Sequence, residues 1–306
     1  MLEMPDLFER HMLIGQKHVE NKEFIEASEH FEKAYDIKDD LVANVSLTKS
    51  LMELEAYDDA YKIMVEHKKD YLQNKEYHDV YFTLLNKCHL FLEIEKFFLL
   101  SHVTIKAEWE KKYEIAKDYQ LVINQKKFDE LKTLFLSIPE KKPLEQTMIL
   151  KQMVYFPKEV FVELAKELII AKQLPIFLRN ELVNQLVQLK VEEEITLLTW
   201  EEVQREFVPS KGVSLADSYR DSEIVKEVAE YYTMNQPSLK QEVLQLMKLH
   251  IGCMYPFEKE TMQPVSDWVN SYIHRYLDET SDKALESIYT YQQKLDEEIT
   301  KLLIFQ

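Results

Sequence analysis

The residues that could do chemistry are scattered along this 306-residue chain and form no familiar catalytic motif. The sequence contains no H-E-x-x-H or C-x-x-C motif, no G-x-S-x-G nucleophile motif and no G-x-x-x-x-G-K-[ST] phosphate loop. Each of those spacings brings ligands, a nucleophile or phosphate-binding amides to one point. We therefore expect no catalytic residues, no metal site and no cofactor, and a protein that is not an enzyme.

Two short combinations come closest to a metal site or a reactive pair. His11 and His18 are seven residues apart and would share a helix face with Glu9 nearby, but no third ligand stands at a fixed spacing. Cys88 and His89 are adjacent, so on a helix their side chains would point about 100° apart. We interpret both combinations as ordinary helix surface.

Three further groups have a functional and a structural interpretation. Asp58 and Asp59 could bind a cation, but at a helix start they also complement the helix dipole. The acidic residues 192–194 fit a solvated edge. The apolar segment 252–257 could anchor a partner or form a buried corner between two helices. We expect the structural role in each case.

Glycine is the most informative count, because the chain contains only 3. Folds that bind dinucleotides or phosphates need glycine-rich turns, so doubly wound and P-loop enzymes are strongly disfavoured. Scarce glycine with abundant leucine, glutamate and lysine predicts an almost entirely helical protein.

The chain is acidic, with a formal net charge of −17. Such a surface repels phosphate backbones, so we expect no nucleic-acid partner, and charge favours a basic or apolar peptide instead. Cys88 and Cys253 lie far apart in the sequence, as in proteins of a reducing compartment. Because we find no secretory signal and no apolar run of roughly 18 residues, we expect a cytoplasmic protein without membrane insertion.

The elements that would position any binding residues begin with a helical hairpin near the N-terminus. Gly15 and Ala27 are small where two antiparallel helices would touch, since a larger side chain would hold the backbones apart. Phe24 and Phe31 are large where the space between the helices must be filled. Ala34 is small again, which lets the next helix approach.

The same order returns 33 residues later, at Tyr57, Ala60 and Met64. This order of small and large residues resembles the tetratricopeptide repeat, a helix–turn–helix unit of about 34 residues that stacks on copies of itself. Taken with softer motifs in its second half, the chain resembles tetratricopeptide-repeat proteins of low-GC Gram-positive bacteria. That resemblance implies a binding scaffold and no established activity.

The resemblance also implies which residues would face a bound partner, because the first helix of each repeat lines a concave groove. In the first unit these residues would be Glu9, Met12, Gln16, Val19 and Glu20. In the second unit they would be Val42, Val45, Lys49, Met52 and Glu53. Relatives that grip a chaperone's terminal carboxylate use lysine and asparagine where this chain has Met12 and Gln16, so that role is not implied.

Helical periodicity continues beyond the two clear repeats and is interrupted once. Pro139 and Pro143 mark a linker, and β-branched and aromatic runs at 195–200 and 203–208 predict a β-hairpin. The predicted fold is an all-α superhelix of the tetratricopeptide type with one small hairpin in its C-terminal half. We expect four regions: a repeat domain (1–138), connecting helical repeats (139–190), the hairpin (191–212) and a C-terminal helical domain (213–306).

The last predicted helix has two interpretations. Its apolar residues recur at heptad spacing, interrupted by Gln292; they are Leu285, Ile288, Leu295, Ile299 and Leu302. Such a face could form a homodimer or cap the helical array. Fewer than four uninterrupted heptads favour the cap.

We expect a non-enzymatic adapter whose groove binds a segment of another cytoplasmic protein. One alternative is a receptor for a short signalling peptide that lacks a DNA-binding domain, since the repeat begins near Phe8. A second alternative is an enzyme built in the C-terminal half, which a buried cluster of Asp, His or Glu would favour.

Overall fold

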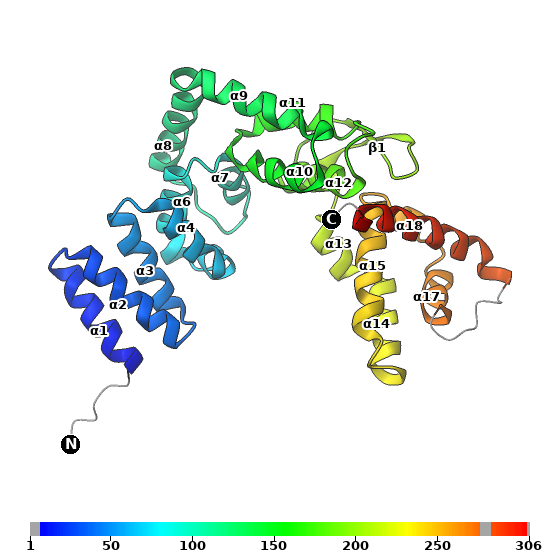
Figure 1. Ribbon diagram of the computed structural model, residues 1–306, viewed down its shortest axis with the longest axis horizontal. Coiled ribbons are helices and arrows are strands. Elements are labelled where there is room, and N and C mark those ends of the chain that lie inside the picture. Colours follow the sequence, from blue (N-terminus) through cyan, green and yellow to red (C-terminus); the bar gives the residue numbers. More distant parts are fainter. Residues whose placement is uncertain (1–6, 276–282, 305–306) are drawn as a thin grey trace. The chain divides into compact units, whose positions relative to one another are not determined.

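The computed structural model describes residues 7–275 and 283–304, the last four by their backbone alone. Within these ranges the protein is almost entirely helical and contains one two-stranded antiparallel sheet, which confirms the all-α class with a small hairpin (Figure 1). The chain divides into two compact units, Met1–Phe128 with Val154–Lys158 and Asp129–Met153 with Glu159–Gln306. The finer division into four regions stays a prediction.

The first unit consists of helices in which α1 to α4 each pack against the next one along the chain. The helices are α1 (Leu7–Glu20), α2 (Phe24–Ile37), α3 (Leu41–Glu53), α4 (Tyr57–Glu66), α5 (Lys68–Gln73), α6 (His78–Lys87), α7 (Phe91–Phe98) and α8 (Ala107–Asp118). The predicted small residues Gly15, Ala27, Ala34 and Ala60 are buried, as are Phe31 and Met64, whereas Phe24 and Tyr57 are half-buried.

Gly15 lies directly against Phe31. A Cβ atom added at Gly15 would lie 2.7 Å from the Phe31 ring, closer than any real contact. The absence of a side chain therefore lets α1 and α2 approach each other closely, with the phenyl ring filling the space between them.

The turns within the helical hairpins share one geometry. Lys22, Glu55 and His89 have left-handed backbone conformations, with φ of 62°, 57° and 54°. Each follows a helix that is closed by a backbone bond from an N–H to the carbonyl five residues earlier: Glu23 to His18 at 2.8 Å, Ala56 to Leu51 at 2.9 Å and Leu90 to Leu85 at 2.9 Å. This is the Schellman cap, and it recurs here at intervals of 33 and 34 residues.

The second unit contains the remaining helices and the hairpin. Its helices are α10 (Pro143–Leu150), α12 (Ile176–Gln188), α13 (Leu215–Asp221), α14 (Glu223–Asn235), α15 (Lys240–Met254), α16 (Glu258–Thr261), α17 (Val265–His274) and α18 (Glu286–Ile304). Two more, α9 (Gln125–Leu136) and α11 (Lys158–Leu168), begin where the units meet in the sequence. Strands β1 (Ile195–Leu198) and β2 (Gln204–Phe207) pair antiparallel with Ile195 opposite Phe207.

The apolar face of α18 is buried within its own unit. Leu285, Leu295 and Ile299 are buried, and the amide of Gln292 donates to the hydroxyl of Ser271 at 2.8 Å. A dimer through this part of the helix is therefore excluded, and the capping interpretation is correct; the side chain of Leu302 lies outside the described residues. The segment 252–257 forms a buried corner between α15 and α16, as predicted.

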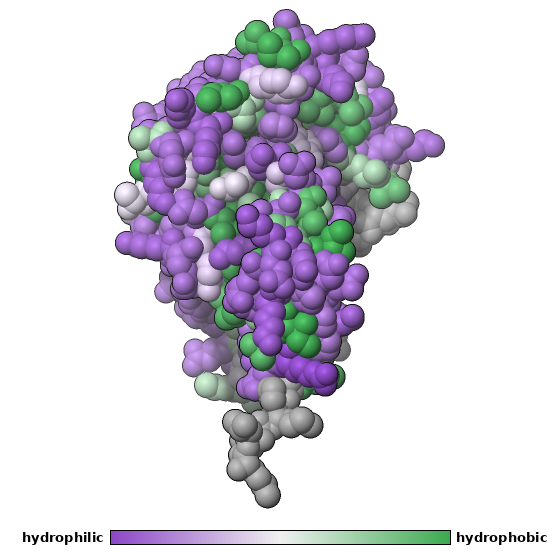
Figure 2. Space-filling view, turned by 90° about the vertical axis from the view of Figure 1, so that its left-hand side faces the viewer, coloured by the Kyte–Doolittle hydropathy of each residue, from purple (hydrophilic) through white to green (hydrophobic). Residues whose placement is uncertain are grey.

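Hydrophilic residues dominate the face of the molecule shown in Figure 2, where hydrophobic residues gather only in small separate groups. In the part of the chain that the structure describes, every helix is too short or too polar to cross a lipid bilayer.

Candidate functional groove

Helices α1, α3 and α6 of the first unit enclose a groove of about 730 Å³. The structure brings together six residues expected to face a partner: Gln16, Val19, Glu20, Lys49, Met52 and Glu53. The groove is also lined by residues that the sequence analysis did not place there: Lys22, Phe24, Phe31, Ser46, Ser50, Asp79, Val80 and Thr83.

The other expected groove residues lie elsewhere. The expectation for Val45 is wrong, because this side chain is only 5% exposed and lies on the side of α3 that packs into the core. Met12 packs against the buried cluster of Ala27, Phe31 and Leu47, so it supports the groove from behind. Glu9 and Val42 are exposed but do not line the groove.

The groove has an apolar floor and a charged rim. Val19, Phe24, Met52 and Val80 are half-buried in it. The exposed rim carries both signs of charge, on Glu20, Lys22, Lys49 and Glu53. Among the described residues no ion pair engages any of these four charges, so all of them are available to a partner.

Asp79 differs from the other charged groups of the groove. Its carboxylate accepts from the ammonium of Lys106 at 2.5 Å and from the indole N–H of Trp109 at 3.0 Å. The bond from Lys106 is the largest cause of a lowered pKa at Asp79. This carboxylate therefore stays ionised and holds α8 against α6, and it is less available to a partner.

The contribution of α6 could have been found by extending the repeat. Ser46 and Ser50 line the groove from α3, and Asp79 and Thr83, each 33 residues further on, line it from α6. The sequence analysis stopped at two units because the small and large residues of the third unit no longer match the first.

Three histidines meet on the outer side of α1 and α2. The Nδ1 atoms of His11 and His30 are 2.9 Å apart, and the ring of His18 stacks on His30 with the ring centroids 5.5 Å apart. Burial, followed by the neighbouring His11, lowers the pKa of His30. No group of ligands suited to a metal ion is present among the described residues, so His11, His18 and Glu9 do not form a metal site there.

The second unit contains a buried cluster of the kind that the enzyme alternative required. The ring of His250 bonds to the hydroxyl of Tyr272 at 2.8 Å and to a carboxylate oxygen of Asp296 at 3.0 Å. Both His250 and Tyr272 have 0% exposure, so no substrate reaches them in this structure. We interpret the cluster as a structural network.

Neither cysteine has the properties of a nucleophile. Burial raises the pKa of the Cys88 thiol to about 11 and that of Cys253 to about 12. Both thiols are therefore protonated and unreactive at neutral pH.

Comparisons with protein-family models, with curated proteins and with solved structures found no match for this chain. The case for a function therefore depends on the groove, its charges and the recurring turns.

Proposed function

We propose that the first unit is a tetratricopeptide-like binding module, whose groove holds a peptide segment of another cytoplasmic protein without catalysing a reaction. The observation that carries this proposal is the convergence of α1, α3 and α6 on one groove with an apolar floor and unpaired charges on its rim. Its volume of about 730 Å³ lies within the range of roughly 300–1,000 Å³ typical of ligand-binding clefts.

The recurring turns support the same proposal. A Schellman cap at regular intervals places successive helical hairpins in similar orientations, which is the basis of repeat arrays. In such arrays the corresponding helices of neighbouring repeats form one continuous surface. Here α1 and α3 follow that arrangement, and α6 extends it by a third helix.

The groove favours a partner segment with an apolar stripe flanked by charges. Val19, Phe24, Met52 and Val80 would receive the apolar side chains. The rim would pair with charges of either sign and so fix the orientation of the segment. The net charge of −17 would favour the approach of a basic segment over an acidic one.

Reversing one rim charge should weaken peptide binding about tenfold, equivalent to about 1.4 kcal/mol. The test selects 12-residue peptides from a displayed random library on the full chain and measures their affinities by calorimetry. Lys49→Glu should lose this affinity, because Lys49 lies on the rim of the groove and has no partner within the described chain.

Lys33→Glu is the matched control, because Lys33 is an exposed lysine of α2 that does not line the groove. It should bind the selected peptides as the natural chain does. Equal affinities for both variants, or a selection that yields no binding peptide, would contradict the proposal.

A further inference from the structure

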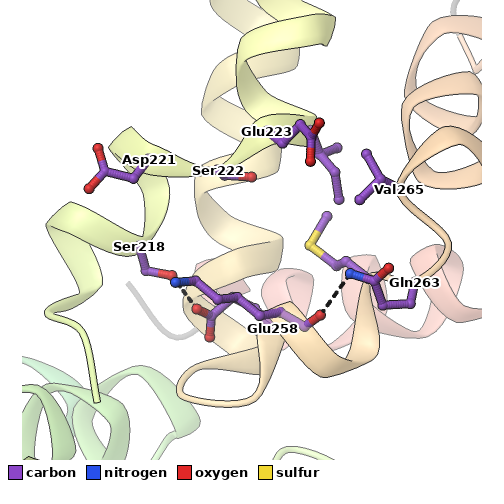
Figure 3. Close-up of a pocket in the computed structure, with 10 residues that line it drawn as sticks. Ser218, Asp221, Ser222, Glu223, Glu258, Gln263 and Val265 are labelled. Carbon is purple, nitrogen blue, oxygen red and sulfur yellow. Dashed lines mark hydrogen bonds between the residues drawn. The ribbon is translucent and has the colours of Figure 1, made fainter. Parts of the chain in front are cut away.

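The second unit has a pocket of its own, with a volume of about 240 Å³. Figure 3 shows Ser218 and Glu258 hydrogen-bonded to each other, with Gln263 and Val265 further along the lining. The wall is apolar at Ile224, Met262 and Val265. All of these residues belong to the second unit, so this site does not depend on the groove of the first.

Glu258 is the unusual residue of the pocket. Its side chain is only 6% exposed, and one carboxylate oxygen, Oε1, accepts a hydrogen bond from the hydroxyl of Ser218. The other oxygen, Oε2, is buried and has no hydrogen-bond partner in the described protein. A buried carboxylate without a compensating partner is strongly unfavourable, so this oxygen calls for a donor that the protein does not provide.

The other charges around the pocket leave an excess of negative charge. Asp221 is engaged by the guanidinium of Arg220, with both contacts at 3.1 Å. Glu223 forms no ion pair within the described chain. Lys259 is the one cation among the lining residues, and no ion pair joins it to Glu258. The pocket therefore favours a positively charged ligand.

We propose that this pocket binds a small organic cation, an alkylguanidinium or alkylammonium group, with Glu258 as its buried counter-ion. Ser218 holds the carboxylate in place, and the free Oε2 accepts a charge-assisted hydrogen bond from the cation. The aliphatic part of the ligand packs against Ile224, Met262 and Val265.

The volume sets the size of the ligand. At about 30 Å³ for each water molecule, a pocket of about 240 Å³ holds the equivalent of about eight waters. A guanidinium group with a chain of about four carbons fits that space. The same group occurs in free amines and guanidines and at the end of an arginine or lysine side chain, so the experiment has to separate these two sources.

The test measures the binding of 1-butylguanidinium to the full chain by calorimetry and by the shift in melting temperature. Glu258→Gln should weaken binding at least tenfold, because it removes the charge and keeps the shape. Glu227→Gln is the matched control, since Glu227 is an exposed residue of α14 outside the pocket, and it should bind normally. Neutral 1-pentanol should not bind.

Two further arms complete the test. Val265→Phe fills the apolar end of the pocket and should also abolish binding, which keeps the proposal testable if Glu258→Gln fails to fold. The capped peptide acetyl-Ala-Arg-Ala-amide should compete with 1-butylguanidinium if the pocket takes a side chain, and should not compete if it takes only free cations. Absence of binding at 10 mM 1-butylguanidinium, or equal binding by the Glu258→Gln and Glu227→Gln variants, would overturn the proposal.

Discussion

Replacing Phe31 with alanine should lower the free energy of unfolding of the first unit by about 3–5 kcal/mol. The ring is only 1% exposed and fills the space above Gly15, where even a Cβ atom would be 2.7 Å away. With the ring removed, the cluster of Ala27, Phe31 and Leu47 keeps only one large side chain. The backbones of α1 and α2 are already close and have little room to collapse into the cavity.

Hydrogen exchange of peptides from α1 and α2, followed by mass spectrometry, measures this loss locally. Ile25→Ala is the matched control, because Ile25 lies in α2 but is 60% exposed, and it should change stability by no more than about 0.5 kcal/mol. Gly15→Leu should destabilise the same hairpin by about 1–3 kcal/mol through overpacking. If α1 and α2 exchange no faster in Phe31→Ala than in Ile25→Ala, the close packing described here is wrong.

The second large effect is expected at Asp296, where alanine should destabilise the second unit by about 2–3 kcal/mol. One oxygen of this carboxylate bonds to His250 at 3.0 Å, and the other accepts from the guanidinium of Arg275 at 2.7 Å. Without it, the fully buried ring of His250 loses its partner on Nε2, and Arg275 loses its counter-charge. Glu297→Ala, at an exposed neighbour on α18, should have little effect.

This effect should also depend on pH. Burial alone would raise the pKa of Asp296, but the hydrogen bonds from His250 and Arg275 outweigh it and hold the pKa below its ordinary value of 3.8. A carboxyl with a lowered folded-state pKa stabilises the protein above the unfolded pKa, and this stabilisation is lost as the pH falls through the folded value. In urea unfolding, the difference between the natural chain and Asp296→Ala should therefore be full at pH 6 and shrink below about pH 4.

A difference that stays constant down to pH 2 would contradict the assigned role of the carboxylate. A variant as stable as Glu297→Ala at neutral pH would do the same, since it would show that His250 and Arg275 find other partners.

The first unit could be predicted in detail because small and large residues alternate there with a helical period. Gly15, Ala27 and Phe31 mark the contact between two helices, and Tyr57, Ala60 and Met64 repeat that pattern. The β-hairpin followed from its β-branched and aromatic runs, although the left-handed Glu202 in its turn carries no glycine signal. Local sequence was sufficient wherever the packing partners lie within one repeat.

Other features could not be predicted because their causes are not local. The Schellman caps use Lys22, Glu55 and His89, whereas glycine is the usual marker of such a cap. Val45 faces the core because of how α3 packs, which its position in the repeat does not reveal. The pocket in the second unit depends on Ser218 meeting Glu258, forty residues apart in the sequence.

The central claim is that a partner lies in the groove between α1, α3 and α6. Site-specific photo-crosslinking inside cells tests it most directly, with the reactive amino acid placed at Met52 on the groove floor or at Ile25 on the outer side of α2. The account predicts that the Met52 position forms adducts concentrated in one segment of a partner protein, and that the Ile25 position does not. Equal adducts from both positions, or none from Met52, would contradict it.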